Sequence, residues 1–166
     1  MSKPLSAYGL SSLRTAPAST ESEVPKLVWT STAEAPEDRY MVTESGTRKR
    51  RPTASDPLVF ELRKVQGKAN PLTMGITVGR ADTNDVVIDD VSISRFHAYF
   101  QQDARTGLWT LVDAESSNHT FVGPLRLEPS KPHTLGMQEQ IRFGDVPAIF
   151  MQPEAFRVYL KMMMKT

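Results

Sequence analysis

Residues 75–122 read GITVGRADTNDVVIDDVSISRFHAYFQQDARTGLWTLVDAESSNHTFV, and their pattern decides the fold. Short apolar or alternating runs at 75–80, 85–88, 97–103, 108–113 and 119–123 predict strands. Gly, Asp, Asn and Ser stand between the runs, where they favour turns. The gaps are too short for crossover helices, so the pattern predicts an antiparallel β-sandwich.

The same pattern continues on both sides of this stretch. Further strand-like runs occur at 57–65, 124–127, 133–135, 139–144 and 147–152. Pro153 then opens a segment with apolar residues three and four positions apart, which predicts a helix over about 153–164. We therefore expect a domain at 57–166, with the sandwich ending near residue 151.

Residues 1–56 have a different composition. They hold five of the twelve prolines and many Ser, Thr, Glu and Ala residues, and their largest apolar cluster is Leu27-Val28-Trp29. Such a segment buries too little apolar surface to offset the entropy lost on ordering. The composition predicts a disordered leader.

Charge and cysteine content limit the classes of partner. The formal net charge is +1, which gives no overall field for nucleic acid or a membrane surface, and no apolar run is long enough to span a bilayer. Cysteine is absent, which excludes disulfides and fits a reducing compartment. We expect a cytoplasmic protein without a cofactor, and we do not expect nucleic acid as a partner.

Three polar clusters fall on predicted loops: Gly79-Arg80, 94–97 (SRFH) and 113–120 (DAESSNHT). Arginine presents a planar set of donors suited to phosphate, and serine hydroxyls add short donors. An asparagine can bind a peptide backbone through both its donor and its acceptor. Together these residue types indicate a binding site for an anionic peptide.

The order Gly-Arg, Asn-Asp-Val-x-Ile, Ser-Arg-x-His and Asp-x(2–3)-Ser-x-Asn-x-Thr resembles the forkhead-associated (FHA) domain family over about residues 57–151. The resemblance implies an eleven-stranded β-sandwich that binds phosphothreonine peptides through loops at one end. It implies phosphate contacts from Arg80, Ser94 and Arg95, a hydroxyl contact from Ser117 and a main-chain contact from Asn118. It also implies architectural roles for Gly79, His97 and Thr120, with His97 bracing the loop that presents Ser94.

One position departs from the family pattern. His119 stands where the family has glycine, the residue that adopts a positive φ without steric cost. We expect either strain in this loop or an added ring contact to the ligand.

Three other features of the sequence could suggest a hydrolase, a metal site or a basic interaction motif. Ser94 and His97 could suggest a hydrolase, but no nucleophile elbow accompanies them, so we expect no catalytic residue. The crowded acidic residues Asp82, Asp85, Asp89 and Asp90 lack EF-hand spacing and are expected to be turn residues, not a metal site. The run Arg48-Lys49-Arg50-Arg51 stays open between a solvated hinge, a nuclear-localisation-like patch, a weak nucleic-acid contact and a kinase determinant at Thr53.

The sequence therefore predicts a phosphothreonine-binding adaptor in Ser/Thr kinase signalling, without enzymatic activity. The alternative is a phosphate-independent FHA-like scaffold. A further hypothesis is that the leader, phosphorylated at Thr20 or Thr53, is itself a ligand. With the leader joined to the end of the sandwich away from the binding loops, Thr20 could reach its own site and Thr53 only that of a neighbouring molecule.

Overall fold

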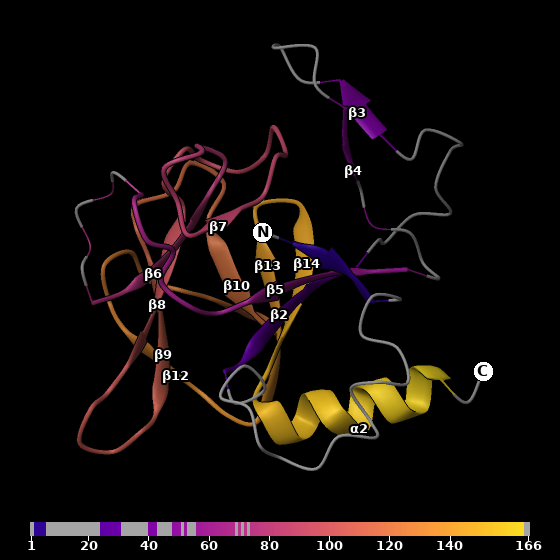
Figure 1. The fold of residues 1–166 in the computed structure, drawn as a ribbon. Helices are drawn as coiled ribbons and strands as arrows, with labels where there is room; N and C mark the ends of the chain where they lie inside the picture. The colour runs from indigo at the N-terminus through magenta and orange to yellow at the C-terminus, as the bar shows by residue number, and fades with distance from the viewer. Residues whose placement is uncertain are drawn as a thin grey trace.

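The computed structural model describes residues 2–5, 24–30, 40–42, 48–50, 52, 56–68, 70, 72 and 74–164, which form a two-sheet sandwich and one helix (Figure 1). One sheet has the order β1 (Lys3–Pro4), β5 (Leu58–Glu61), β2 (Lys26–Trp29), β14 (Val146–Met151), β13 (Gln138–Phe143), β10 (Thr120–Val122) and β11 (Leu125–Arg126). The other has the order β12 (His133–Leu135), β9 (Trp109–Asp113), β8 (Ala98–Gln102), β6 (Ile76–Gly79) and β7 (Val86–Val87). A separate antiparallel ladder joins β3 (Tyr40–Val42) to β4 (Arg48–Arg50).

The core lies between the two large sheets. Alternate residues of β8, β13 and β14 point inward, and their rings meet: Phe100 stacks on Phe150 at 5.7 Å and meets Phe143 edge-on at 6.4 Å. All three rings are fully buried. The all-β sandwich predicted from alternation is confirmed, and each predicted run from Pro57 onward contains a strand.

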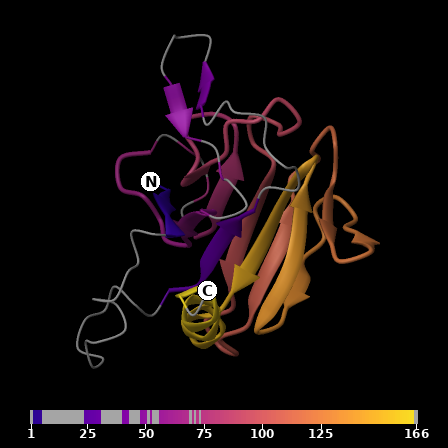
Figure 2. The same ribbon diagram turned by 90° about the vertical axis from the view of Figure 1, so that its right-hand side faces the viewer.

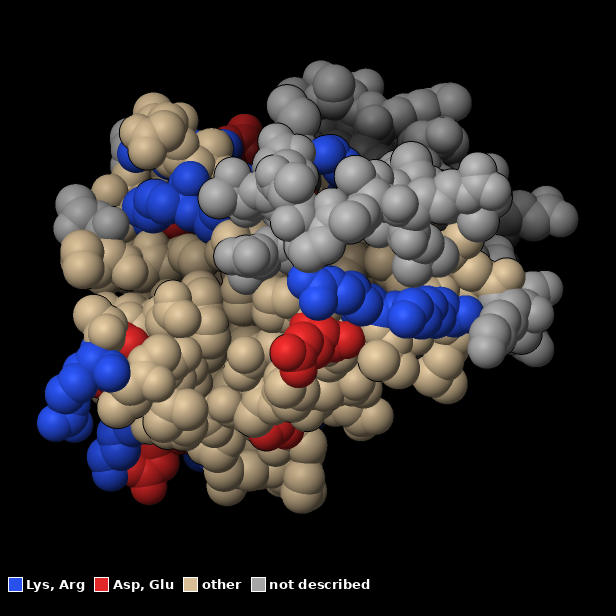
Figure 3. Space-filling view, turned by 60° about the horizontal axis from the view of Figure 1, so that its bottom comes forward, with Lys and Arg blue, Asp and Glu red and all other residues tan. Residues whose placement is uncertain are grey.

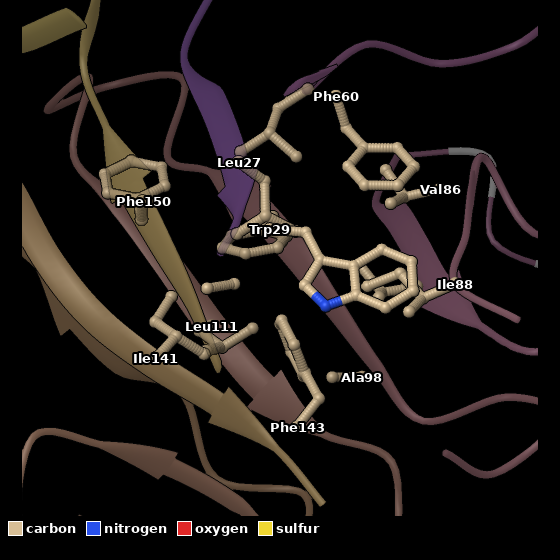
Figure 4. Packing of buried hydrophobic residues seen from close by; sticks show 14 of the residues in the cluster. Leu27, Trp29, Phe60, Val86, Ile88, Ala98, Leu111, Ile141, Phe143 and Phe150 are labelled. Carbon is tan, nitrogen blue, oxygen red and sulfur yellow. The ribbon is translucent and has the colours of Figure 1, made fainter. Parts of the chain in front are cut away.

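The structure corrects the prediction that residues 1–56 stand outside the fold. Strand β2 lies in the middle of a sheet, paired with β5 on one side and β14 on the other. Leu27 and Trp29 enter the main core, where Trp29 packs beside Val86 and Ile88 (Figure 4). Both faces of β2 are buried, so three consecutive apolar residues suffice for this strand despite its polar surroundings. A domain boundary at residue 57 is therefore wrong for Lys26–Trp29, while most of the remaining leader lies outside the described residues.

Helix α2 (Pro153–Met164) covers the outer face of the seven-stranded sheet, as the end-on view in Figure 2 shows. Phe156 and Leu160 of the helix pack with Val28, Val59 and Met151 in a second apolar cluster. The predicted helix is confirmed at 153–164. The helix also covers β2, which the composition had assigned to the disordered leader, because Val28 of β2 packs in this cluster.

The strand directions decide which connections share an end of the sandwich. The β13–β14 turn contacts the 88–97 and 114–119 loops, since the Asp145 N–H donates to Ser92 and the Gly144 N–H to His119. We call this the recognition end; α2 begins at the opposite end (Figure 1). Trp29 pairs with both Ala148 and Leu58, so β2 ends and β5 begins toward the recognition end.

This corrects the geometry expected for Thr20 and Thr53, both of which lie outside the described residues. The chain preceding β5 starts near the recognition end rather than away from it. Lys26, the first residue of β2, pairs with Met151, two residues before α2 begins. Strand β2 therefore begins at the end of the sandwich where α2 begins.

Candidate functional site

The three predicted polar loops meet and are hydrogen-bonded to one another. The backbone N–H of Arg80 donates to Ser94 O at 3.0 Å, which joins the 80–85 loop to the 88–97 loop. The N–H of Ser117 donates to Ser94 Oγ at 3.0 Å, which joins the 114–119 loop to the same residue. Ser94 is therefore the point at which all three loops are connected.

Gly79 lies where these loops pack most closely. A Cβ at this position would overlap the Arg95 carbonyl oxygen and lie 2.7 Å from Nδ2 of Asn84. Asn84 is buried, and its Nδ2 donates to Arg95 O at 2.6 Å and to Ala81 O at 2.9 Å. Gly79 thus allows the approach, and Asn84, to which the sequence assigned no role, holds Arg95 in place.

Arg80, Ser94 and Ser117 present donors at the surface. The Nε of Arg80 donates to Ile93 O at 3.2 Å, which orients the guanidinium and leaves its two terminal nitrogens for a ligand. Ser94 Oγ accepts from Ser117, so its own proton is not used by that bond. Arg80, Arg95 and Ser117 are exposed and Ser94 is half-buried. This arrangement can bind an oxyanion without prior rearrangement.

Asn118 is exposed beside these donors. Its Nδ2 donates to Ser92 O at 2.8 Å. Ser92 is in turn fixed by Asp90, whose Oδ1 accepts from both the N–H and the hydroxyl of Ser92. The Asn118 carbonyl oxygen is the part of the side chain suited to accept from a peptide N–H.

His97 hydrogen-bonds to two of the loops from inside the domain. Its Nδ1 accepts from the Ser94 N–H at 3.0 Å, so Nε2 carries the proton and donates to His119 O at 3.0 Å. The ring is fully buried and meets Phe143 edge-on at 5.8 Å. Burial lowers the pKa of His97, although the bond to His119 and the charge of Asp113 act in the opposite direction. The neutral ring is the form that this bonding pattern requires.

His119 has φ = 67°, the left-handed conformation expected where the family has glycine. Its carbonyl oxygen also accepts from the Gly144 N–H at 2.9 Å. Two bonds therefore hold the residue in a conformation that its side chain disfavours.

A buried carboxylate closes the 114–119 loop. Asp113 Oδ1 accepts from the hydroxyls of Ser116, at 2.5 Å, and Thr120, at 2.6 Å, and Oδ2 accepts from the Ser116 N–H. Thr120 is fully buried, in agreement with its architectural role. The sequence placed Asp113 in the polar cluster but did not indicate that its carboxylate holds Ser116 and Thr120 together.

The described residues do not give the geometry that a hydrolase or a calcium site would require. His97 bonds to the backbone N–H of Ser94, so within the described part of the chain its ring is not positioned as a base for the Ser94 hydroxyl. Asp85 lies in the bend before β7, and its buried carboxylate accepts from Lys64 Nζ at 2.8 Å and from Thr77. Burial opposes ionisation, yet the bonds from Lys64, Thr77 and Val65 hold the pKa of Asp85 below its usual value. Among the described residues, no group of three metal-ligating side chains occurs and no helix could cross a bilayer.

Comparison with known proteins finds a family match for one segment of the chain. The family model of the FHA domain matches residues 76–144, which include all three loops. The oxoglutarate dehydrogenase inhibitor of Corynebacterium diphtheriae is 32% identical over 76 residues, 46% of this chain and 50% of the relative. The nuclear inhibitor of protein phosphatase 1 of Homo sapiens is 36% identical over 63 residues, 38% of this chain and 18% of the relative.

The chain thus spans half or less of the length of these two curated relatives. A solved FHA domain from an Arabidopsis thaliana protein is 22% identical, with a TM-score of 0.49, over 83% of this chain and 93% of that one. Residues 76–144, which carry all three loops, therefore match the FHA domain.

Proposed function

We propose that this chain binds threonine-phosphorylated proteins through Arg80, Ser94, Arg95, Ser117 and Asn118. It would act as an adaptor or regulatory module in Ser/Thr kinase signalling, without catalysis of its own. The observation that carries the proposal is the junction at Ser94, which brings together donors from three loops. FHA domains are binding modules for phosphothreonine peptides, and the matched segment contains the junction.

The mechanism is electrostatic recognition by donors already in place. A phosphothreonine carries a charge of about −1.5 to −2 and three acceptor oxygens, and plain threonine has neither. Each hydrogen bond to a charged group contributes about 1.5–3 kcal/mol, so two or three separate the two peptides by orders of magnitude. Arg80 is oriented before binding by its bond to Ile93 O, which reduces the entropy lost in the complex.

Two features support a regulatory binding role. The relatives named above are both described as inhibitors of another enzyme, which requires binding and not turnover. His97, which lies close to Ser94, uses its Nδ1 to accept from the Ser94 backbone N–H and not from its hydroxyl. A cysteine-free chain that recognises kinase products also suits a cytoplasmic setting, which we include in the proposal.

A phosphothreonine peptide library, screened against the full chain, tests the activity and identifies the preferred flanking residues. We expect enrichment of phosphothreonine peptides by the parent and loss of that enrichment in Arg80→Ala and Ser94→Ala. Arg80→Ala should retain the parent's unfolding midpoint because Arg80 is exposed, whereas Ser94→Ala should lower the midpoint slightly because it loses the bond from the Ser117 N–H. A parent that enriches phosphorylated and plain peptides equally would favour the phosphate-independent scaffold instead.

A further inference from the structure

Lys64 lies in the connection between β5 and β6, residues 62–75, and its ammonium group is bonded three times inside the protein. Its Nζ donates to Asp85 Oδ2 and Asn70 Oδ1, each at 2.8 Å, and to Gly75 O at 2.9 Å. An ammonium group has three donors, so these bonds use all of them. Lys64 is therefore an internal anchor and not a cation that a ligand could bind.

The Asp85 carboxylate joins this connection to the start of β6. Its side chain is fully buried. Oδ1 accepts from the Val65 N–H at 3.0 Å, and Oδ2 accepts from the N–H of Thr77 at 2.9 Å. The N–H of Asp85 donates in turn to Thr77 Oγ1 at 3.0 Å. Because a buried carboxylate without a cation is strongly unfavourable, Lys64 is needed to keep Asp85 in this position.

Asp85 directly follows Asn84, the residue that holds the Arg95 backbone. Asn84 Nδ2 donates to Arg95 O at 2.6 Å, and the Ala81 N–H donates to the same oxygen at 3.2 Å. A displacement of Asp85 would therefore move Asn84 and, with it, the contact between the 80–85 and 88–97 loops.

Asn70 gives Lys64 a second connection to the same loop. Its Oδ1 accepts from Lys64, and its Nδ2 donates to Thr83 O at 2.8 Å. The family match covers residues 76–144, so Asp85 lies inside the matched segment and Lys64 outside it. The loop that carries Arg80 is thus held by a part of the chain that the match does not include.

We propose that Lys64 is a positioning residue of the phosphopeptide site, acting through Asp85 and Asn84 on the loops that carry Arg80 and Arg95. The inference rests on the proposed function and adds to it a residue that does not touch the ligand. Loops already held in the binding conformation lose less entropy when a peptide binds. Without Lys64, binding must order both arginines, so affinity falls although both remain in the chain.

The experiment titrates the full chain with a phosphothreonine peptide taken from the library screen. We expect Lys64→Met and Asp85→Asn each to lose about three- to tenfold in affinity. The double variant should bind within about twofold of the weaker single variant, because both substitutions remove one interaction. Asn70→Ala leaves no buried charge unpaired, and it carries the test if Lys64→Met fails to fold. Its expected loss is about two- to threefold.

Two control variants lie on α2, which begins at the end away from the loops. Figure 3 shows the face at this end, with basic side chains at its surface. Lys161→Met removes the same charge from an exposed position. Leu160→Ala leaves a cavity in the apolar cluster beneath the helix and lowers stability far from the loops. Both should bind the peptide as the parent does, which separates positioning from losses of charge and of stability.

Amide hydrogen exchange gives a readout that needs no ligand. The N–H groups of Arg80 and Ala81 donate to Ser94 O and Arg95 O across the two loops. In Lys64→Met these two amides should exchange faster than in the parent, while those of β13 keep the parent's rates. Faster exchange in β13 to the same extent would show a general loss of stability and would contradict a local role.

Affinities at the parent level in Lys64→Met and Asn70→Ala, or additive losses in the double variant, would overturn the positioning role while leaving phosphothreonine binding intact. A loss in Leu160→Ala equal to that in Lys64→Met would do the same. If the parent itself binds no phosphothreonine peptide, the proposed function fails, and this inference fails with it.

Discussion

At Gly79 the packing of the 80–85 and 88–97 loops leaves no room for a side chain. We expect Gly79→Ala to lower the free energy of unfolding by about 1–3 kcal/mol, because the methyl group must displace the Arg95 carbonyl or Asn84. Phosphopeptide affinity should fall as well, since Arg95 moves. Denaturant unfolding measures the first effect. Gly136→Ala is the matched control, because its Cβ would meet only the flexible Glu139 carboxylate at 3.3 Å. Parent-like stability and affinity in Gly79→Ala would contradict this account of the loop junction.

His97 gives the fold a dependence on pH. Its pKa is lowered in the folded chain, so the unfolded chain binds the proton at higher pH than the folded one does. The stability contribution is complete above the unfolded value of about 6.5 and is lost as pH falls below it, by up to about 1.4 kcal/mol per pH unit. The free energy of unfolding measured from pH 7.5 to 5.5 should therefore decline more steeply in the parent than in His97→Asn. Parallel curves would show that His97 does not cause the decline.

Several site residues were predictable because their chemistry is visible in the sequence. Arg80, Ser94 and Asn118 stand in a recognisable order, and the structure brings their loops together. Asn84 and Asp113 were not assigned roles, because an asparagine or aspartate in a loop looks the same whether it is solvated or buried. Only the packing shows that Asn84 spans two loops and that Asp113 holds Ser116 and Thr120.

Among the elements, sequence patterning missed the four strands before residue 57, of which β2 is the one in the middle of a sheet. A strand buried on both faces shows no alternation, and four residues between Pro25 and a polar stretch resemble a chance apolar cluster. Its place is decided by partners far along the chain, β14 and β5. The strands from β5 onward alternate or lie between clear turn residues, and for that reason local pattern was enough to predict them.

The position of β2 makes a direct prediction about Leu27. Leu27 is fully buried in the core, so Leu27→Ala should lower the free energy of unfolding by about 2–5 kcal/mol. Leu125→Ala removes the same atoms from a side chain that is 51% exposed and should change stability by no more than about 0.5 kcal/mol. Thermal or denaturant unfolding compares the two. Similar small effects for both variants would return residues 26–29 to the disordered leader.

For the whole molecule, the folded unit must include β2. Without it, β5 and β14 have no strand between them, and the residues that pack against Val28 beneath α2 become exposed. We expect the fragment 24–166 to unfold cooperatively and the fragment 57–166 to lack a cooperative transition. Calorimetry of the two fragments measures this difference. A cooperative transition in 57–166 with the same midpoint as 24–166 would mean that β2 is dispensable.

The proposed recognition of phosphothreonine depends on the loops joined at Ser94. Its most direct test is calorimetric titration of the full chain with one peptide in two forms, carrying either phosphothreonine or threonine at the same position. The geometry predicts tighter binding of the phosphorylated form by at least about two orders of magnitude, because each charge-assisted bond contributes about 1.5–3 kcal/mol. It also predicts that Arg80→Ala removes most of this difference without unfolding the chain. Equal affinities for the two forms, using the best peptide from the library, would contradict the claim.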